Sequence, residues 1–269
     1  MGLITLTTDF GLKDGNVGVM KGVIWGIAPA TQIVDLSHLI GPQNIPEAAL
    51  ILLRSAPYFP DGTVHVVVVD PGVGTARRPL VARLGGQYFV GPDNGVITLW
   101  LERTEGQGLL PESTQVTEFL HLDRPQYWLP EVSHVFHGRD IFAPVAAHLS
   151  SGVPLIKLGT PITDPTLLAL PQPERTAIGW RGEVIHLDHF GNIATNLLRQ
   201  HLEGQPVATV GLNGVKIQGM VHTFGERPTG EIIALFGSTG NLIVSEVKGN
   251  AAQRLSAKVG DRVEVIIKV

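Results

Sequence analysis

Apolar residues in the first half of the chain follow two different spacings. Leu3–Thr8 and residues 32–36 are short runs rich in apolar and β-branched side chains, which is typical of strands. Residues 17–27 instead carry an apolar residue at every fourth position from Val19, and this spacing predicts a helix that ends before Pro29. The chain therefore begins with a strand, a helix and a second strand.

The same alternation continues to about residue 150. Residues 64–69 are almost purely β-branched, which suits a strand buried on both faces of a parallel sheet. Residues 46–55 and 139–150 have helical patterns, and residues 87–90 read as a short strand. Together these elements predict an α/β domain with a mostly parallel sheet over residues 1–160.

The pattern changes after this domain. Residues 159–173 hold four prolines and show no periodicity, which is typical of a linker. Short β-rich runs follow, separated by turn pairs such as Asn213-Gly214 and Gly260-Asp261. We therefore expect a small antiparallel β domain over residues 174–269, either a barrel or a sandwich.

The amino-acid composition narrows the classes of site and partner that the protein can have. The chain has no Cys, so it has no disulfide, thiolate zinc site or cysteine nucleophile, and it is compatible with a reducing cytoplasm, where we expect it. It has no run of ~20 apolar residues, and its beginning lacks the order of a signal peptide. With a net charge of -4 and scattered Lys and Arg, it is expected to bind a small molecule rather than nucleic acid or a membrane.

Three predicted strands end in a carboxylate. Asp9, Asp35 and Asp70 each follow such a strand. Ligands of open parallel sheets bind outside the carboxyl ends of the strands, so the three acids are candidates for one crevice. The alternative is that each Asp only caps the turn that follows its strand.

The segment after Asp70 reads D-P-G-V-G-T-A-R-R. Its Pro and Gly residues predict a tight bend that returns Arg77 to the strand end, where it pairs with Asp70. A structural salt bridge is the alternative, and Arg78 is expected to be a solvated surface residue. The glycines are reminiscent of a phosphate-binding loop, but no G-K-[ST] follows.

A second cluster, H-V-F-H-G-R-D-I-F-A-P, places His137 directly before a predicted helix. Gly138 breaks the chain there, which leaves His137 free to project into the crevice; a structural role is equally consistent with the spacing. Asp140 is expected to stabilise the helix dipole. His134 and His137 are three residues apart, as are two histidines at 186 and 189, but a metal site would need a helix to bring such pairs together.

The densest polar cluster of the second half is L-D-H-F-G-N-I-A-T-N. Phe190 offers a plane on which a purine can stack, and Asn192 offers an amide for the edge of an adenine; Asp188 precedes them. The alternative is a polar loop packed by one Phe.

Five motifs in order resemble the S-adenosyl-L-methionine (SAM) hydroxide adenosyltransferase family, relatives of the fluorinating and chlorinating enzymes. They are T-D-F-G, V-V-D-P-G-V-G-T-x-R, G-P-D-N-G, F-H-G-R-D-I-F-A-P and D-H-F-G-N-I-x-T-N, and they span nearly the whole chain. The resemblance implies an N-terminal α/β domain, a C-terminal β-barrel and a homotrimer. Its active sites would lie between the N-terminal domain of one subunit and the C-terminal domain of its neighbour.

The resemblance also assigns roles to residues. It places the family's water-activating groups on Asp70, Arg77 and His137. The positions that match substrate contacts are Asp9 for the ribose hydroxyls, Asp188 for the methionine amino group, Phe190 and Asn192 for adenine, Ser238 for the methionine carboxylate, and Asn250 and Ala251 where the family closes over adenine. Thr239 replaces an Arg of the fluorinating branch, and Asn241 stands where an aromatic is common.

The implied reaction is hydrolysis of SAM to adenosine and L-methionine, by hydroxide attack at the ribose C5′ and with no metal or other cofactor. The halogenating relatives carry Tyr where this chain has Asp70, which favours hydroxide over halide. Two alternatives remain: a non-catalytic adenosine or SAM sensor, and a SAM-dependent halogenase.

Overall fold

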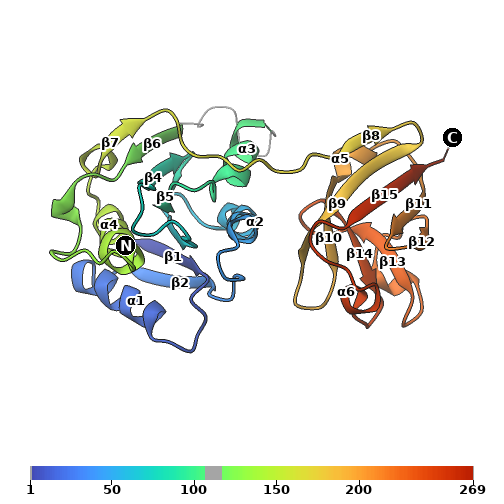
Figure 1. The fold of residues 1–269 in the computed structure, drawn as a ribbon, viewed down its shortest axis with the longest axis horizontal. Coiled ribbons are helices and arrows are strands. Elements are labelled where there is room, and N and C mark those ends of the chain that lie inside the picture. The colour runs from blue at the N-terminus through green and yellow to red at the C-terminus, as the bar shows by residue number, and fades with distance from the viewer. Residues whose placement is uncertain (1, 107–116, 269) are drawn as a thin grey trace. The chain divides into compact units, whose positions relative to one another are not determined.

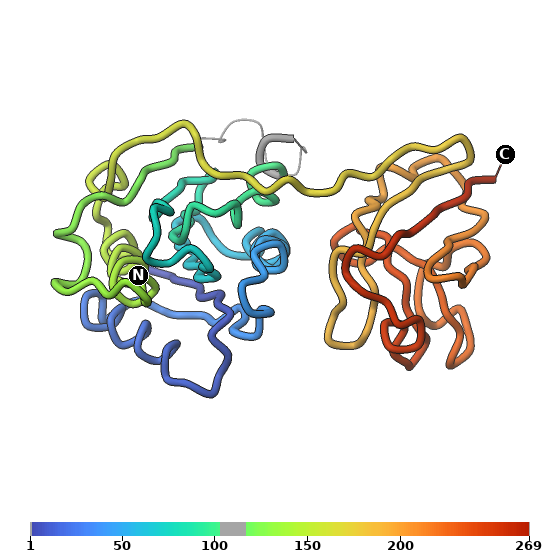
Figure 2. Tube along the Cα trace, viewed as in Figure 1, coloured from blue at the N-terminus to red at the C-terminus, as the bar shows by residue number. Residues whose placement is uncertain are grey.

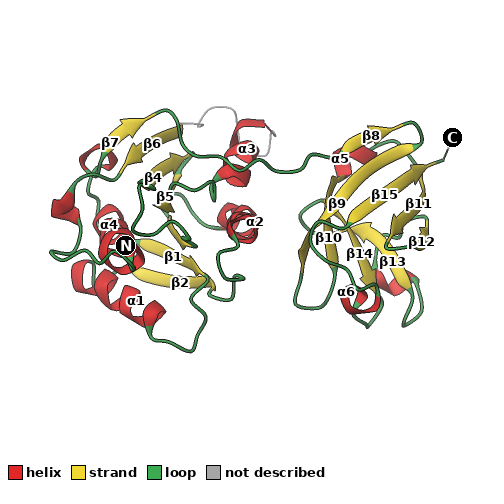
Figure 3. Cartoon of the chain, in the orientation of Figure 1, coloured by secondary structure: helices red, strands yellow, loops and turns green. Residues whose placement is uncertain are grey.

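The computed structural model describes residues 2–106 and 117–268, and the chain divides into two compact units, Met1–Leu168 and Ala169–Val269 (Figure 1). Each unit is one continuous stretch of chain, as the colour of the trace shows in Figure 2. Helices and strands alternate in the first unit, whereas strands dominate the second (Figure 3).

Within the described part of the first unit, seven strands form one sheet in the order β2-β1-β3-β5-β4-β6-β7. They are β1 (Leu3–Thr8), β2 (Gln32–Ser37), β3 (Val64–Val68), β4 (Pro79–Leu84), β5 (Gln87–Pro92), β6 (Thr117–His121) and β7 (Thr160–Ile162). Strands β2, β1, β3 and β5 run parallel, and β4, β6 and β7 each run antiparallel to their neighbours. The predicted α/β domain is confirmed.

Helices cover both faces of this sheet. They are α1 (Asn16–Ile27), α2 (Ile45–Ser55), α3 (Thr98–Gly106) and α4 (Ala143–Ser150). Alternate residues of β3 enter two different cores: Val66 packs with α1 and α4, whereas Val67 packs with α2 and α3. Every residue of β3 is buried, so its β-branched run reflects burial on both faces, as predicted.

The buried face of helix α1 matches its sequence pattern only in part. Val23 and Ile27 of that pattern pack against the core, but Val19 is 44% exposed. The most buried residues of the helix are Val17, Met20 and Ile24. The helix is apolar nearly all round, so its sequence alone does not define which side meets the sheet.

The sequence pattern did not predict two strands near the centre of the chain, β4 and β7. Strand β4 forms a hairpin with β5 across Gly85-Gly86, a pair of residues that is itself a hairpin signal. Strand β7 and residues to Leu168, expected to belong to a linker, lie in the first unit instead. The Leu168 amide donates to Thr98 Oγ1 over 2.8 Å, which holds the end of this segment.

The described strands of the second unit form an antiparallel sheet in the order β12-β11-β15-β9-β10-β14-β13, with β8 paired to β9. They are β8 (Glu174–Thr176), β9 (Gly179–Leu187), β10 (Ile193–Leu198), β11 (Val207–Leu212), β12 (Val215–Gln218), β13 (Ile232–Phe236), β14 (Asn241–Glu246) and β15 (Arg262–Ile267). The Val221 amide, just after β12, donates to the Ala234 carbonyl of β13 over 3.0 Å. This bond joins the two edges of the sheet, and the predicted barrel is confirmed.

Two short helices, α5 (Arg199–Leu202) and α6 (Ala251–Arg254), complete the second unit. Its core contains Val184, Leu242 and Val263, and it is separate from the two cores of the first unit. No helix in residues 2–106 or 117–268 is long and apolar enough to cross a membrane.

Candidate active site

The carboxyl ends of the parallel strands carry two of the three predicted acids. Asp9 follows β1 and Asp70 follows β3, and these neighbouring strands end at the same edge of the sheet. Asp35 lies within β2, where it is 40% exposed and pairs with Lys21 Nζ over 2.6 Å and His38 Nε2 over 3.0 Å. Lys21 and His38 lower the pKa of Asp35 against the opposing effect of its burial. Asp35 is therefore occupied by structural partners.

Asp70 and Arg77 form the ion pair that the turn predicts. Arg77 Nε donates to Asp70 Oδ1 over 3.0 Å, and Arg77 Nη2 donates to Asp70 Oδ2, so the contact is bidentate. The two side chains are only 5% and 7% exposed, respectively. Because solvent screens a buried pair weakly, Arg77 and Asp70 hold each other in one geometry.

The turn between them is built by glycine. Gly74 has a φ of +75°, and a Cβ there would lie 2.3 Å from the His134 carbonyl oxygen. Thr75 closes the bend, because its Oγ1 donates to the Gly72 carbonyl over 2.7 Å. The turn thus lies directly against the segment that leads to His137.

His137 is brought to the strand end by a tight contact of the next residue. Gly138 begins η3, a turn of π-helix over Gly138–Phe142. A Cβ on Gly138 would lie 3.2 Å from Val68 Cγ1 and 3.3 Å from Met20 Sδ, so glycine allows this segment to approach β3 and α1 closely. Turns of π-helix are rare and often occur at functional sites.

Arg77 also defines the protonation of His137. Its Nη2 lies 3.0 Å from His137 Nδ1, and because a guanidinium only donates, Nδ1 accepts and carries no proton. Burial, and after it the charge of Arg77, lower the pKa of His137 from its ordinary value of 6.5. At neutral pH the ring is therefore neutral, with its proton on Nε2.

One nitrogen of the cluster has no protein partner. Arg77 Nη1 is buried, yet it forms no hydrogen bond with any residue in the described ranges. A buried guanidinium nitrogen without a partner is costly unless a ligand or water satisfies it. Arg77 Nη1, the remaining lone pairs of Asp70 and the Nε2 proton of His137 together form a set of groups suited to hold one small oxygen species.

Asp9 lies at the same edge of the sheet, and its neighbour Phe10 contacts the segment that carries His137. The ring of Phe10 packs edge-to-face on Phe136, with centroids 5.5 Å apart, so the residues beside Asp9 and His137 are in contact. The Asp9 carboxylate accepts from the Gln43 amide over 2.8 Å. Sequence reasoning missed both aromatic rings, although F-G and F-H-G stand in the motifs that it singled out.

The second unit carries the other predicted contacts. Asp188 organises its loop: Oδ1 accepts from the Phe190 amide over 2.9 Å and from the Asn192 amide over 2.8 Å, and Oδ2 accepts from Asn192 Nδ2 over 2.7 Å. Phe190 is 74% exposed, which is unusual for a large apolar ring. Because Asn192 Nδ2 is engaged, its Oδ1 is the atom left to accept from a ligand.

Asn250 and Ala251 adjoin this loop. Asn250 caps α6 by accepting from the Gln253 amide over 2.8 Å, and its side chain occupies the space that a Cβ on Gly191 would fill. Ala251 is almost fully buried in the core of the second unit. Asn250 therefore supports the loop, and Ala251 packs in the core beside it.

Ser238 lies elsewhere in the second unit. It is exposed in the turn between β13 and β14, and Asn241 begins β14 opposite Leu198. The 188–192 loop precedes Ile193, which pairs with Val244 toward the other end of β14. The pairing of Asn241 with Leu198 and that of Val244 with Ile193 are three residues apart along β14, about 10 Å. Thr239 and Asn241 hydrogen-bond to each other over 2.9 Å.

Asp140 and Arg78 have partners that the sequence did not indicate. Asp140 lies in the first turn of η3, as expected for a residue that stabilises a helix dipole, but it is fully buried and accepts from the Ser133 amide over 2.8 Å and from Arg139 Nε over 2.5 Å. Arg78 is 29% exposed and pairs with Asp93 and Asp164, so it is a partly exposed, ion-paired residue rather than a fully solvated one.

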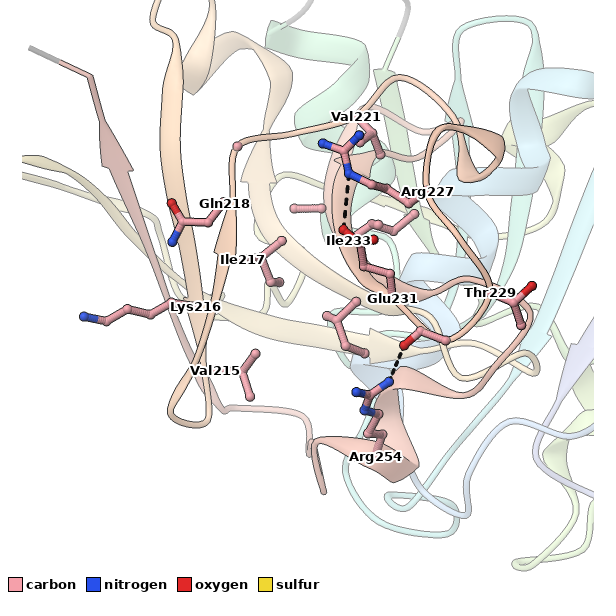
Figure 4. Close-up of a pocket in the computed structure, with 14 residues that line it drawn as sticks. Val215, Lys216, Ile217, Gln218, Val221, Arg227, Thr229, Glu231, Ile233 and Arg254 are labelled. Carbon is pink, nitrogen blue, oxygen red and sulfur yellow. Dashed lines mark hydrogen bonds and ion pairs between the residues drawn. The ribbon is translucent and has the colours of Figure 1, made fainter.

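A groove of the second unit lies apart from all these residues. It runs between β12 and β13, and Arg227 pairs there with Glu231 over 3.2 Å (Figure 4). Arg254 likewise pairs with Glu246 over 2.8 Å, so these charges are satisfied within the protein. Within the described ranges, no group of three or more acidic or His side chains is placed to hold a metal ion.

The chain thus has the make-up of a two-domain enzyme: an α/β domain, which carries the Asp–Arg–His cluster at the carboxyl edge of its sheet, is followed by a β-barrel domain. Residues 4–159 match the N-terminal domain of the SAM hydroxide adenosyltransferases, and residues 182–264 match their C-terminal domain. The chain belongs to the SAM hydroxide adenosyltransferase family.

Named relatives agree with this family. The (R)-S-adenosyl-L-methionine hydrolases of Thermus thermophilus and Salinispora tropica are 42% and 38% identical, over 96% and 97% of this chain and 97% of each relative. An uncharacterised conserved protein from Thermotoga maritima has the same fold, with a TM-score of 0.87 and 36% identity over 97% of this chain and 99% of that one. A fluorinase from Actinoplanes is more distant, at 26% identity over 75% of this chain and 73% of the relative.

Proposed function

We propose that this protein hydrolyses SAM to adenosine and L-methionine, with water activated by Asp70, Arg77 and His137. The observation that carries the proposal is the buried, unpartnered Nη1 of Arg77 beside a carboxylate and a neutral imidazole. The (R)-SAM hydrolase relatives, which match nearly the full chain, support the substrate.

In this proposal each group of the cluster has its own role in the reaction. Arg77 Nη1 and the Nε2 proton of His137 donate to the attacking oxygen and stabilise its growing negative charge. Asp70 accepts the proton that leaves the water. As the oxygen bonds to the ribose C5′, the C5′–S bond breaks and its electron pair goes to sulfur, so the sulfonium becomes the neutral thioether of methionine. The proton on Asp70 then passes to solvent.

Burial of the cluster favours this reaction. Opposite charges disappear in the transition state, and bulk water solvates the separated charges better than the partly neutralised state. A nearly dry Asp70–Arg77 pair removes that advantage. A sulfonium is also a good leaving group by itself, so the proposed reaction uses no metal and no organic cofactor.

The substrate contacts follow the family match residue by residue. Asp9 binds the ribose hydroxyls, and Phe190 and Asn192 bind adenine, for which the exposed ring and the free amide oxygen are suited. In the same match Asp188 binds the methionine amino group and Ser238 its carboxylate. Because these two groups share one carbon, the assignment requires the β13–β14 turn and the 188–192 loop to approach the same methionine. Asn250 and Ala251 close over adenine, Asn250 by supporting the loop at Gly191.

The proposed assembly is a homotrimer in the cytoplasm. The motifs that resemble the family distribute substrate contacts between both units of the chain, and in the family these come from neighbouring subunits. The 74% exposure of Phe190 in the single chain agrees with a ring that is covered by substrate and a partner.

Product analysis in ¹⁸O-labelled water tests the function. We expect SAM to be converted to adenosine labelled at its 5′ oxygen and to unlabelled methionine. Asp70→Asn should lower the rate by about 100-fold or more, because it removes the proton acceptor. Asp123→Asn is the matched control, since Asp123 pairs with Arg124 away from the cluster; it should react normally.

Other outcomes distinguish the alternatives. SAM recovered intact would indicate a sensor. A requirement for halide, with a 5′-halo-adenosine as product, would indicate a halogenase. Loss of turnover with a chelator would indicate metal-dependent chemistry. Any of these would contradict the proposal.

A further inference from the structure

The G-P-D-N-G motif has no role in the mechanism above, yet its Asn94 reaches the catalytic strand. Asn94 Nδ2 donates to the Val69 carbonyl over 2.9 Å, directly before Asp70, and its Oδ1 accepts from the Val96 amide over 3.3 Å. The side chain thus ties the turn after β5 to the last residue before the catalytic acid.

Asp93, one residue earlier, holds the other end of the same loop. Its side chain is only 2% exposed, and Oδ2 accepts from Arg78 Nε over 2.9 Å. Its backbone amide donates to the Arg78 carbonyl, also over 2.9 Å. Arg78 directly follows Arg77, so Asp93 fixes both the backbone and the side chain of the residue after the catalytic guanidinium.

Asp93 has a third contact, to the segment that leaves the first unit. Its Oδ1 accepts from the Thr166 amide over 2.7 Å, and Arg78 also donates to Asp164 Oδ1 over 2.9 Å. A buried carboxylate that accepts from both Arg78 and Thr166 is destabilising to disturb, because loss of either partner leaves a buried charge or donor unsatisfied.

We propose that Asp93 and Asn94 are positioning residues, which hold the Asp70–Arg77 loop at both ends so that its two charged groups meet His137. The inference rests on the proposed function for its consequence in catalysis. The bonds from Asp93 and Asn94, adjacent residues of one turn, fix the two ends of the loop relative to each other. Small displacements of reacting groups lower rates severely.

Asn94→Asp tests the positioning role of Asn94 most directly. It keeps the oxygen that accepts from Val96 but replaces the donor to Val69 by an oxygen that repels the carbonyl. The matched control is Asn196→Asp in the second unit, where Asn196 Nδ2 donates to the Pro171 carbonyl over 3.0 Å and Oδ1 accepts from the Glu183 amide over 2.9 Å. This control removes the same kind of hydrogen-bond donor, at a position far along the chain from the catalytic loop.

We expect kcat of Asn94→Asp, per folded molecule, to fall roughly 10- to 100-fold with little change in KM for SAM. Asn196→Asp should keep the wild-type kcat. The kcat of Asn94→Ala, which removes the donor without adding charge, should also fall. This variant replaces Asn94→Asp in the test if Asn94→Asp does not fold.

An NMR titration of His137 without substrate gives the readout that a merely structural role would not move. Arg77, Asp70, Asp140 and His134 all influence this ring, and Arg77 lowers its pKa. Arg77 lowers this pKa more than Asp70 raises it, so displacement of the loop that carries both should raise the pKa of His137. The titration is made on Asn94→Ala, which adds no charge of its own, and His137→Gln is used to assign the signal.

Wild-type kcat and an unchanged His137 titration in the folded Asn94 variants would overturn the inference. So would a fall in kcat that matches only the loss of folded protein, with the titration unchanged. If wild-type protein does not hydrolyse SAM, the proposed function fails, but the titration still decides whether Asn94 positions the loop.

Discussion

Arg77 connects the two other members of the cluster. Two of its nitrogens bind Asp70, and Nη2 also meets His137 Nδ1, so one guanidinium orients both a carboxylate and an imidazole. This arrangement requires His137 to be neutral, because a proton on Nδ1 would point at a cation. Nη1 is buried and has no hydrogen-bond partner among the described residues.

The pH dependence of the reaction follows from this geometry. Burial and Arg77 lower the pKa of His137 below 6.5, so the neutral, active form prevails at neutral pH and is lost as the pH falls through the lowered pKa. We expect kcat/KM to be level above pH 6.5 and to decline only below it. A steady-state pH profile of hydrolysis measures this.

The matched control for the pH profile is His148→Gln. Burial also lowers the pKa of His148, but its ring packs on Tyr127, with centroids 5.2 Å apart, outside the cluster. Its variant should keep the wild-type profile. An acid limb of the wild type centred at or above pH 6.5 would contradict the assigned state of His137.

Among the elements, the turn after β3 is the one whose backbone shape matters most. Gly74 has a left-handed conformation and lies against the His134 carbonyl, so the turn and the segment before His137 share one contact. Gly85, in the β4–β5 hairpin, has a similar φ of +62°, but a Cβ there would meet no atom within 4 Å. The two glycines differ only in what surrounds them.

Gly74→Ala and Gly85→Ala test this difference. Each should lose about 1–2 kcal/mol of unfolding free energy from backbone strain. Gly74→Ala should lose more, since its Cβ would lie 2.3 Å from an oxygen, and its kcat should fall at least about tenfold as the turn moves from His137. Urea unfolding and steady-state kinetics measure both effects; equal kcat values for the two variants would refute the argument.

At the scale of the whole molecule, the two units have their own cores, and predicted site residues occur in both. A homotrimer with sites shared between neighbours predicts a mass three times the 28.8 kDa of the chain in sedimentation experiments. A monomer would contradict it.

Mixed trimers test the shared sites directly. Asp70→Asn damages the N-terminal contribution and Asn192→Ala the C-terminal one. If both chains are produced together, random assembly in a cyclic trimer should leave about a quarter of the sites with two intact halves. We expect that fraction of wild-type activity in the mixture and little from either variant alone. No recovery would show that each site uses a single chain.

Local features of the sequence determined the strand and helix alternation, the antiparallel β domain and the Asp70–Arg77 pair. Burial spacing repeats within a few residues, and a turn rich in Pro and Gly brings together residues seven apart in the chain, so neighbouring positions suffice to predict them. The family resemblance added His137 and the substrate contacts.

Only the tertiary structure decided which of these groups meet. His137 reaches Arg77 from 60 residues away because Gly138 packs on β3, and Arg77 then determines its protonation. The partners of Arg78, the burial of Asp140 and the buried face of α1 likewise depend on contacts between distant segments. Long-range packing selects one arrangement among several that the local sequence permits, and the hydrogen bonds of the cluster are a consequence of that choice.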